Sequence, residues 1–154
     1  MTRTAFGMLL CLFLYGCISV SNTHHRSTPD AAAVTDAAQG WADAYNSRDP
    51  ARIAAMYAPD AVFWGTTSPT IRTTPAAIFD YFKDAPKRPD ARVTIVDQHV
   101  VATGDMATSA GTYVFSDMRE GKRTENPSRF TFVFRRNSER WELVHHHSSR
   151  MPAP

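Results

Sequence analysis

Cysteine is nearly absent from this chain of 154 residues, which contains two, Cys11 and Cys17. Both lie in the first 17 residues, so the part that follows has no pair of thiols with which to close a disulfide. It also lacks cysteines at the spacing of a zinc site. We therefore expect the folded part to be stabilised by its apolar core alone.

Long blocks of like charge are missing as well. The chain has 17 Lys and Arg against 15 Asp and Glu, mixed along the sequence, for a formal net charge of +2. A nucleic-acid-binding protein concentrates basic residues on one face or segment, so no nucleic-acid partner is expected. No basic amphipathic helix of the calmodulin-binding kind is evident either.

One apolar run, residues 5–15, follows an early arginine near the start of the chain. It is too short for a confident membrane span and has the order of a secretory signal. The stretch LYGC at residues 14–17 resembles a bacterial lipobox, which predicts lipidation at Cys17. We expect residues 1–17 to be a signal peptide of the lipoprotein type, and the protein to be periplasmic in the bacterial cell envelope, anchored to the membrane. Tyr15 replaces the small residue usual there, so ordinary cleavage with secretion, or an uncleaved anchor, remains open.

Residues 18–29 are polar and lack periodicity, as is typical of a flexible tether. His24 and His25 fall in this tether, where no fixed ligand geometry exists for a metal. The remaining residues, 30–152, are of the right number for a single domain with its own core.

Apolar spacing predicts the elements of that domain. A helix begins at Asp30, and its apolar face consists of Val34, Ala38, Trp41 and Tyr45. Asp49 and Pro50 begin a second, short helix that buries Ile53, Met56 and Tyr57 and ends at residues 58–60. A strand at 61–64 and a helix from Pro75 precede four strands at 92–103, 106–117, 128–136 and 140–149. This order indicates an α+β fold, in which strands that curl around the helices would enclose a pocket.

Several spaced motifs together resemble a known superfamily. The stretches WADAYNSRDPARIAAMYAPDAVFWGT and SRFTFVFRRNSERWELVHHHSSRMP are similar to nuclear transport factor 2-like proteins of the SnoaL-like branch. Within that branch they resemble bacterial proteins related to the association (hub) domain of calcium/calmodulin-dependent protein kinase II. The spaced motifs of that association domain correspond in this sequence to residues 46–49, 104–105, 135–141 and 144–152.

The resemblance implies a cone-shaped, curved antiparallel sheet with three helices on its concave side. It also implies a small-molecule pocket inside the cone, and a homodimer or higher homo-oligomer. Kinase activity is not implied, because the chain has no Gly-rich loop, His-Arg-Asp or Asp-Phe-Gly motif.

Strand alternation identifies candidate pocket residues. Arg129 and Thr131 share one face of their strand and three phenylalanines share the other. If the Arg129 face is concave, its guanidinium is a candidate anchor for a carboxylate or phosphate; the alternative is an Arg paired with an acidic neighbour at a strand end. The resemblance adds Tyr113, His146 and Ser148 to the predicted ligand-binding set. Two aromatic residues from the predicted mouth of the pocket complete it, Trp64 and Tyr45, although aromatic residues at this spacing more often belong to the core.

The triple histidine at 145–147 is split by the same alternation. The resemblance implies that His146 faces the pocket, which places His145 and His147 on the outer face near a partner subunit. His145 and His147 could supply two metal ligands, but the sequence offers no evident third ligand, so neither a metal nor another cofactor is expected.

Three functions from different classes remain. We favour an exported, non-catalytic domain that binds a small, acidic molecule and self-associates. The alternative is an isomerase, cyclase or hydratase, for which His99, His146, Tyr113 and, more weakly, Asp97 are candidate acid-base groups. No spacing among them distinguishes a catalytic base from an ordinary strand residue, and a purely structural envelope module is a third possibility.

Overall fold

The computed structural model describes residues 29–84, 87–138 and 140–153. Three helices, α1 (Pro29–Asn46), α2 (Pro50–Ala54) and α3 (Pro75–Phe82), accompany five strands. The strands are β1 (Tyr57–Trp64), β2 (Arg92–Thr103), β3 (Met106–Arg119), β4 (Lys122–Arg136) and β5 (Trp141–Arg150). The predicted signal peptide, Cys17 and nearly all of the predicted tether lie outside the described residues.

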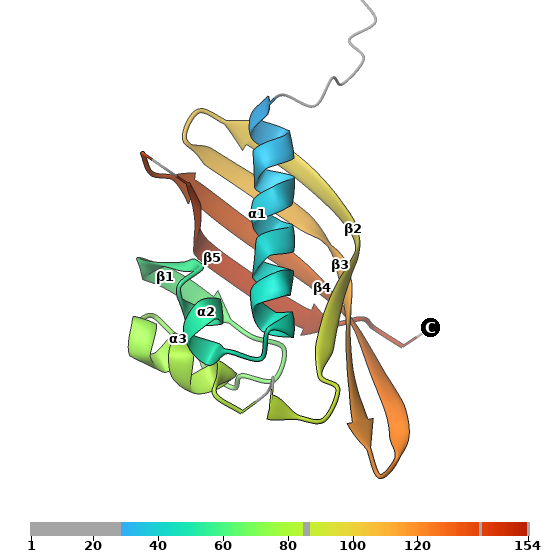
Figure 1. The fold of residues 1–154 in the computed structure, drawn as a ribbon. Helices are drawn as coiled ribbons and strands as arrows, with labels where there is room; N and C mark the ends of the chain where they lie inside the picture. Colours follow the sequence, from blue (N-terminus) through green and yellow to red (C-terminus); the bar gives the residue numbers. More distant parts are fainter. Residues whose placement is uncertain (1–28, 85–86, 139, 154) are drawn as a thin grey trace, which may run out of the picture.

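The strands form one curved sheet in the order β1-β5-β4-β3-β2. Figure 1 shows α1 lying across the concave side of this sheet, with α2 and α3 grouped near β1. The predicted α+β class and curved sheet with three helices are confirmed. One correction concerns strand direction: β1 runs parallel to β5, so the sheet is antiparallel only from β5 to β2.

Helix α1 covers the sheet with the face that its apolar spacing predicts. The four residues of the predicted stripe are buried: Val34, Ala38, Trp41 and Tyr45. At the end of α1, the Asn46 side chain both accepts from Val93 N (2.8 Å) and donates to Val93 O (3.0 Å). An amide that satisfies both backbone groups of a strand residue ties the helix end to β2.

Two proline-led helix starts are confirmed. The Asp49 carboxylate caps α2 by accepting from Ala51 N, and the Thr74 hydroxyl caps α3 by accepting from Ala77 N. Each is followed by a proline at the first helical turn, where no backbone N–H is needed.

The predicted end of the second helix is wrong. Helix α2 ends at Ala54, and Tyr57 is the first residue of β1 instead of a helical residue. The ladder to β5 begins here, because Leu143 N donates to Met56 O (3.0 Å) and Tyr57 lies opposite Leu143. Residues 58–60, which the sequence predicts as a helix stop, therefore belong to a longer strand that carries the Tyr57 side chain inward, where it is buried.

The hairpin between β3 and β4 is also longer than predicted. The two strands pair without interruption from Met106 opposite Arg135 to Arg119 opposite Lys122. Glu120 and Gly121 form the turn with φ of 50° and 73°. A two-residue turn with positive φ matches the twist of the strands, so the ladder can continue to the tip of the hairpin.

A bulge bends β2 around the core. The register shifts between Ile95 and Asp97, and the Asp97 carboxylate accepts from Thr112 N and Thr112 Oγ1, each at 2.7 Å. Gly111 lies directly beneath this bulge: a Cβ there would lie 2.1 Å from Asp97 O and 2.8 Å from Gln98 Cα. The close approach of the two backbones requires glycine at this position.

We predict that Gly111→Ala lowers the free energy of unfolding by about 1–3 kcal/mol, because the added methyl group meets backbone that cannot move aside without losing the bulge. Urea denaturation measures the change. Gly40→Ala is the matched control, since its Cβ would make an ordinary contact at 3.6 Å with Met56 Cε. A variant Gly111→Ala as stable as wild type would contradict this role of the bulge.

Candidate functional site

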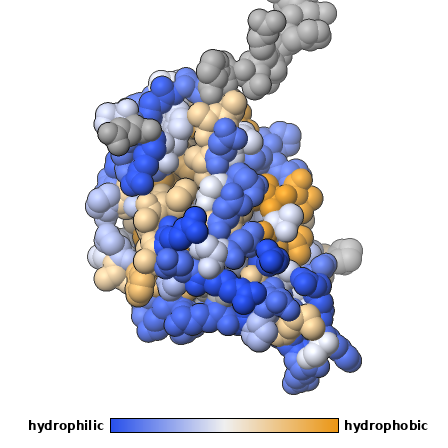
Figure 2. All heavy atoms as spheres, in the orientation of Figure 1, coloured by the Kyte–Doolittle hydropathy of each residue, from blue (hydrophilic) through white to orange (hydrophobic). Residues whose placement is uncertain are grey.

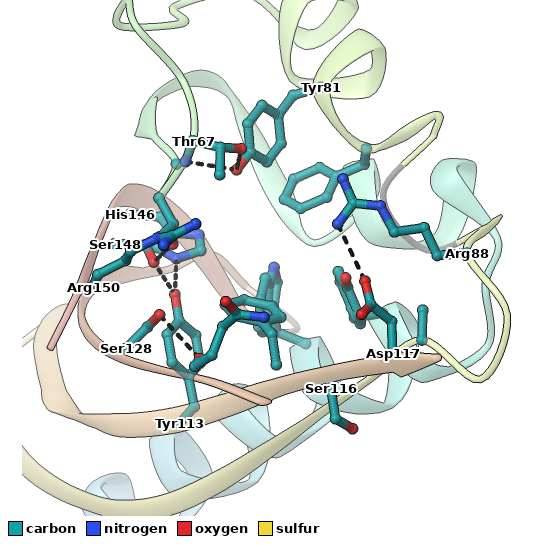
Figure 3. Close-up of a pocket in the computed structure, with 18 of the residues that line it drawn as sticks. Thr67, Tyr81, Arg88, Tyr113, Ser116, Asp117, Ser128, His146, Ser148 and Arg150 are labelled. Atoms are coloured by element: carbon teal, nitrogen blue, oxygen red, sulfur yellow. Dashed lines mark hydrogen bonds and ion pairs between the residues drawn. The ribbon is translucent and has the colours of Figure 1, made fainter. Parts of the chain in front are cut away.

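A cavity lies between the helices and the concave face of the sheet, and Figure 3 shows the side chains that line it. Its floor is aromatic, with contributions from α1, β1, α3 and β3: Trp41, Tyr45, Phe63, Tyr81, Phe82, Tyr113 and Phe115. Polar groups lie at two places, a hydroxyl cluster from β3, β5 and the loop after β1, and a charged cluster at the rim. This combination of an apolar body and a few convergent polar groups is typical of small-molecule sites.

His146 lines the cavity and is 1% exposed. Its Nδ1 is 2.7 Å from the Tyr57 hydroxyl and its Nε2 is 3.3 Å from the Tyr113 hydroxyl. The rings of Trp41 and Phe132 meet it edge-on, with centroids 5.0 and 4.5 Å away. Desolvation in this aromatic shell lowers the pKa of His146 well below its usual range, so the imidazole is neutral at physiological pH.

The hydroxyl cluster joins Tyr113 of β3, Ser148 of β5 and Thr66 of the loop after β1. Tyr113 donates to Ser148 Oγ over 2.5 Å, and Ser148 in turn is hydrogen-bonded to Thr66. Burial raises the pKa of Tyr113 above its usual range, so its phenol stays protonated. The cluster therefore presents neutral hydroxyl groups to the cavity.

The rim carries a charged cluster around Asp117, which is 5% exposed. Its carboxylate accepts from Arg119 Nε (3.0 Å), from Arg88 Nη1 (3.3 Å) and from Thr124. Figure 3 shows the Arg88–Asp117 pair on the opposite side of the cavity from Ser148. The hydrogen bond from Arg119 is the main reason why the pKa of Asp117 falls from 3.8 to about 2, against the opposing effect of burial.

Arg150 lines the same cavity from the end of β5. It lies on the side of β5 that carries His146 and Ser148, because alternate residues of a strand share a face. In the ladder it faces Ser128, which faces Tyr113, so the three form one row across β5, β4 and β3. Among the ion pairs of the described residues none involves Arg150. Its charge, unlike those of Arg88 and Arg119, is available to a ligand.

The structure brings together four of the residues predicted to bind a ligand. Tyr45, Tyr113, His146 and Ser148 all line the cavity. Tyr45 lies on the inward face of α1, Tyr113 on that of β3, and His146 and Ser148 on that of β5.

The other three predicted ligand-binding residues lie elsewhere. Arg129 and Thr131 are on the convex face of β4, and the exposed Arg129 donates to Ser149 Oγ (3.0 Å). The condition that the Arg129 face be concave does not hold, because the three buried phenylalanines of β4 occupy the concave side. Trp64 is 42% exposed and packs edge-on against His147, so it does not line the cavity either.

The remaining acid-base candidates lie outside the cavity. His99 and Asp97 are exposed on β2, and hydrogen bonds from Thr112 lower the pKa of Asp97. Within the cavity, Asp117 is ion-paired and both nitrogens of His146 have hydrogen-bond partners. No described carboxylate or imidazole of the cavity is therefore a free general base.

Sequence reasoning missed Arg150, Thr66 and the Asp117 cluster. Arg150 could have been predicted, because the alternation that places His146 and Ser148 inward also places residue 150 inward. This requires only that the strand extend to residue 150. Thr66 is 82 residues from Ser148 in the sequence, and Arg88 is 29 residues from Asp117. Only the folded arrangement shows that these residues are in contact.

A metal cluster and a membrane-spanning helix are both absent from the described residues. No group of three or more His, Cys, Asp or Glu side chains is placed to hold a metal ion in the described part of the chain. Among the helices of the same residues, none is both long and apolar enough to span a membrane.

A curved sheet that folds around a long helix and encloses a lined cavity is the arrangement of nuclear transport factor 2-like proteins. The family model of the SnoaL-like domain matches residues 34–154. A Xanthomonas campestris protein, described as a calcium/calmodulin dependent protein kinase II association domain, is 31% identical, with a TM-score of 0.70 over 80% of this chain and 86% of that chain. The chain belongs to the SnoaL-like family.

More distant structures share the fold alone. The CamKII hub homology domain from Chlamydomonas reinhardtii is 21% identical, with a TM-score of 0.68 over 80% of this chain and 99% of that chain. A Streptomyces avermitilis protein described as a dehydratase of the NTF2-like family is 20% identical, with a TM-score of 0.72 over 80% and 97%. No curated protein matches the chain. The confirmed resemblance therefore fixes the fold and family, and the site itself must indicate the function.

We predict that Asp117→Asn lowers the free energy of unfolding at neutral pH by roughly 2 kcal/mol, because the folded state then loses a carboxylate whose pKa is about 2 instead of 3.8. A carboxylate whose pKa is lower in the folded state than in the unfolded state stabilises the fold at any pH above its unfolded pKa. This stabilisation is lost as the pH falls from the unfolded pKa to the folded pKa. The difference between wild type and variant should thus shrink between pH 3.8 and about 2.

Urea denaturation at a series of pH values measures this difference. Asp60→Asn is the matched control, since Asp60 forms a surface ion pair with Arg135 and should contribute little. A pH-independent difference for Asp117→Asn would contradict the ion-pair account.

Proposed function

We propose that the protein binds a small, flat, acidic molecule in the cavity and does not catalyse its conversion. The observation that carries the proposal is Arg150, a guanidinium without an acidic partner in the described structure, which lines the cavity on the same side as Ser148 (Figure 3). The Ser148 hydroxyl is hydrogen-bonded to that of Thr66, which also lines the cavity. A carboxylate fits both, because guanidinium and hydroxyl groups donate to its oxygens. The aromatic floor offers the rest of the ligand an apolar surface.

The enzyme alternative has less support. Isomerases and dehydratases of this fold need a group that takes a proton from carbon, and the titratable candidates in the cavity are occupied by their partners. Ion pairing of Asp117 and the aromatic shell of His146 both favour binding without proton transfer.

Self-association is the second part of the proposal, and the convex face of the sheet supports it. Two rows cross all five strands on this face. One consists of Trp64, His147, Thr131, Ala110 and His99, and the other of Val62, His145, Val133, Thr108 and Val101. Neither row contains Asp, Glu, Lys or Arg, and depletion of charge is typical of the centre of an interface.

The same face has large apolar side chains in contact with solvent. Trp64 is 42% and Val101 66% exposed. Figure 2, which views the molecule from the α1 side, shows a further group of apolar residues over β2 at the edge of the sheet. The similarity to association-domain proteins favours a second copy of this chain as the partner. Export to the cell envelope, with Cys17 as the lipid anchor, remains a proposal that rests on the sequence alone.

We predict that Arg150→Gln weakens the binding of benzoate, used as the probe, by roughly ten-fold or more, because a charge-assisted hydrogen bond is lost. Isothermal titration calorimetry measures the affinity. Arg129→Gln is the matched control, the same substitution on the convex face, and should bind benzoate as wild type does. Equal weakening by both variants, or by neither, would refute the cavity as the anion site.

We predict that Thr131→Lys prevents self-association, because it places a charge in the middle of the convex face where a second copy would have to desolvate it. Sedimentation velocity of the purified protein measures the oligomeric state. Thr73→Lys, at an exposed loop position, is the control and should leave it unchanged. A wild-type protein that is monomeric at high concentration would contradict the proposal directly.

A further inference from the structure

A continuous chain of hydrogen bonds runs from α1 through His146 to the cavity. Trp41 Nε1 is 3.0 Å from the Tyr57 hydroxyl, which is 2.7 Å from His146 Nδ1. On the other side of the ring the chain continues through Tyr113 and Ser148 to Thr66. Every link joins groups that are far apart in the sequence, and among the described residues no buried polar side-chain atom lacks a partner.

The donor at the start of the chain sets its direction. An indole N–H can only donate, so the Tyr57 oxygen accepts from Trp41 and its own hydrogen must go elsewhere. In the described structure the other partner of this hydroxyl is His146 Nδ1. If Nδ1 carried a proton instead, the buried Tyr57 hydrogen would have no acceptor, which costs about 1–3 kcal/mol.

The hydrogen bonds on the other side of the His146 ring run in the same direction, from the imidazole towards the cavity. A neutral imidazole whose Nδ1 accepts has its proton on Nε2, and Nε2–H donates to the Tyr113 oxygen. The Tyr113 hydrogen is therefore free to donate to Ser148 Oγ, in agreement with the 2.5 Å contact.

The direction of these hydrogen bonds determines whether a hydroxyl hydrogen of Ser148 or Thr66 is left to donate into the cavity. Ser148 and Thr66 have two hydroxyl hydrogens between them, and their mutual bond uses one. Because Tyr113 donates to Ser148, the second hydrogen remains for the cavity. In the reversed direction Ser148 would donate to Tyr113 and Thr66 to Ser148, and no hydrogen would remain.

We propose that Tyr57 fixes the His146 proton on Nε2 and thereby keeps one hydroxyl hydrogen of the Ser148–Thr66 pair directed into the cavity, as a donor to an oxygen of the anionic ligand. Tyr57 is then a positioning residue that sets ligand preference from the far side of the imidazole. The ligand part of this inference rests on the proposed function, whereas the position of the proton does not.

The proton position is tested on the full protein without ligand. Nitrogen-15 NMR of histidine side chains distinguishes the two neutral tautomers from each other and from the cation. We expect one imidazole that does not change between pH 8 and 5, with the hydrogen on Nε2. A buried imidazole that carries its hydrogen on Nδ1, or on both nitrogens, would overturn the inference.

Substitution tests the link to the ligand. In Tyr57→Phe, Nδ1 loses its donor, so the Nε2–H form should no longer be the sole tautomer and benzoate affinity should fall roughly 2- to 10-fold. Ser109→Ala is the control, because it removes a buried hydroxyl that donates to Gln98 and does not line the cavity; it should change neither the tautomer nor the benzoate affinity. A Tyr57→Phe protein with wild-type tautomer and affinity would also overturn the inference, and if that variant does not fold, the wild-type measurement decides.

Different results would overturn the proposed function and the inference on the His146 proton. An Nε2–H imidazole in a wild-type protein that does not bind benzoate would overturn the proposed function, and with it the ligand part of this inference, while the proton position would stand. Benzoate binding that depends on Arg150 together with an Nδ1–H imidazole would overturn this inference alone.

Discussion

The neutral imidazole of His146, held between two tyrosine hydroxyls, is the interaction on which the site depends. A buried imidazole is tolerated only if both nitrogens find partners, because an unsatisfied buried polar group costs about 1–3 kcal/mol. Those partners are Tyr57 of β1 and Tyr113 of β3, so one side chain of β5 fixes the position of two other strands. Trp41 adds α1 to the same contact, both through Tyr57 and through its ring.

The distribution of charge follows from this centre. The interior of the cavity contains hydroxyls, aromatic rings and a neutral histidine, whereas the ionised groups lie at the rim. Asp117 neutralises Arg88 and Arg119 there, and Arg150 is left without an acidic partner in the described structure. A ligand that enters would thus meet one available positive charge and a hydroxyl donor, and would place its apolar part on the rings. These contacts are the basis of the proposed binding function.

Much of the fold could be predicted from the sequence. The apolar stripe that contains Trp41 and Tyr45 predicts α1, and β2 has the predicted bounds. The residue directly before each of Pro50 and Pro75 caps a helix at its predicted start. The extended segment from Tyr57 to Asp60 could not be predicted, because Ala-Pro-Asp is as compatible with a helix stop as with a strand. Its conformation is decided by pairing with β5 and by the bond from Tyr57 to His146, both long-range contacts.

The site shows where strand alternation is sufficient and where it is not. Alternation separates Arg129 from its phenylalanine neighbours but does not say which face is concave. The stronger apolar character of the phenylalanine face was the available signal, and the structure confirms that this face packs on α1. The resemblance placed His146 and Ser148 in the cavity, and the last strand residue, Arg150, supplies the cation that Arg129 was expected to supply.

A crystal structure with bound benzoate tests the central claim most directly. The account predicts the carboxylate inside the cavity, about 3 Å from both the Arg150 guanidinium and a hydroxyl of the Ser148–Thr66 pair, with the ring against the aromatic floor. Benzoate bound at Arg129 on the convex face, or a cavity that stays empty at saturating benzoate, would contradict it.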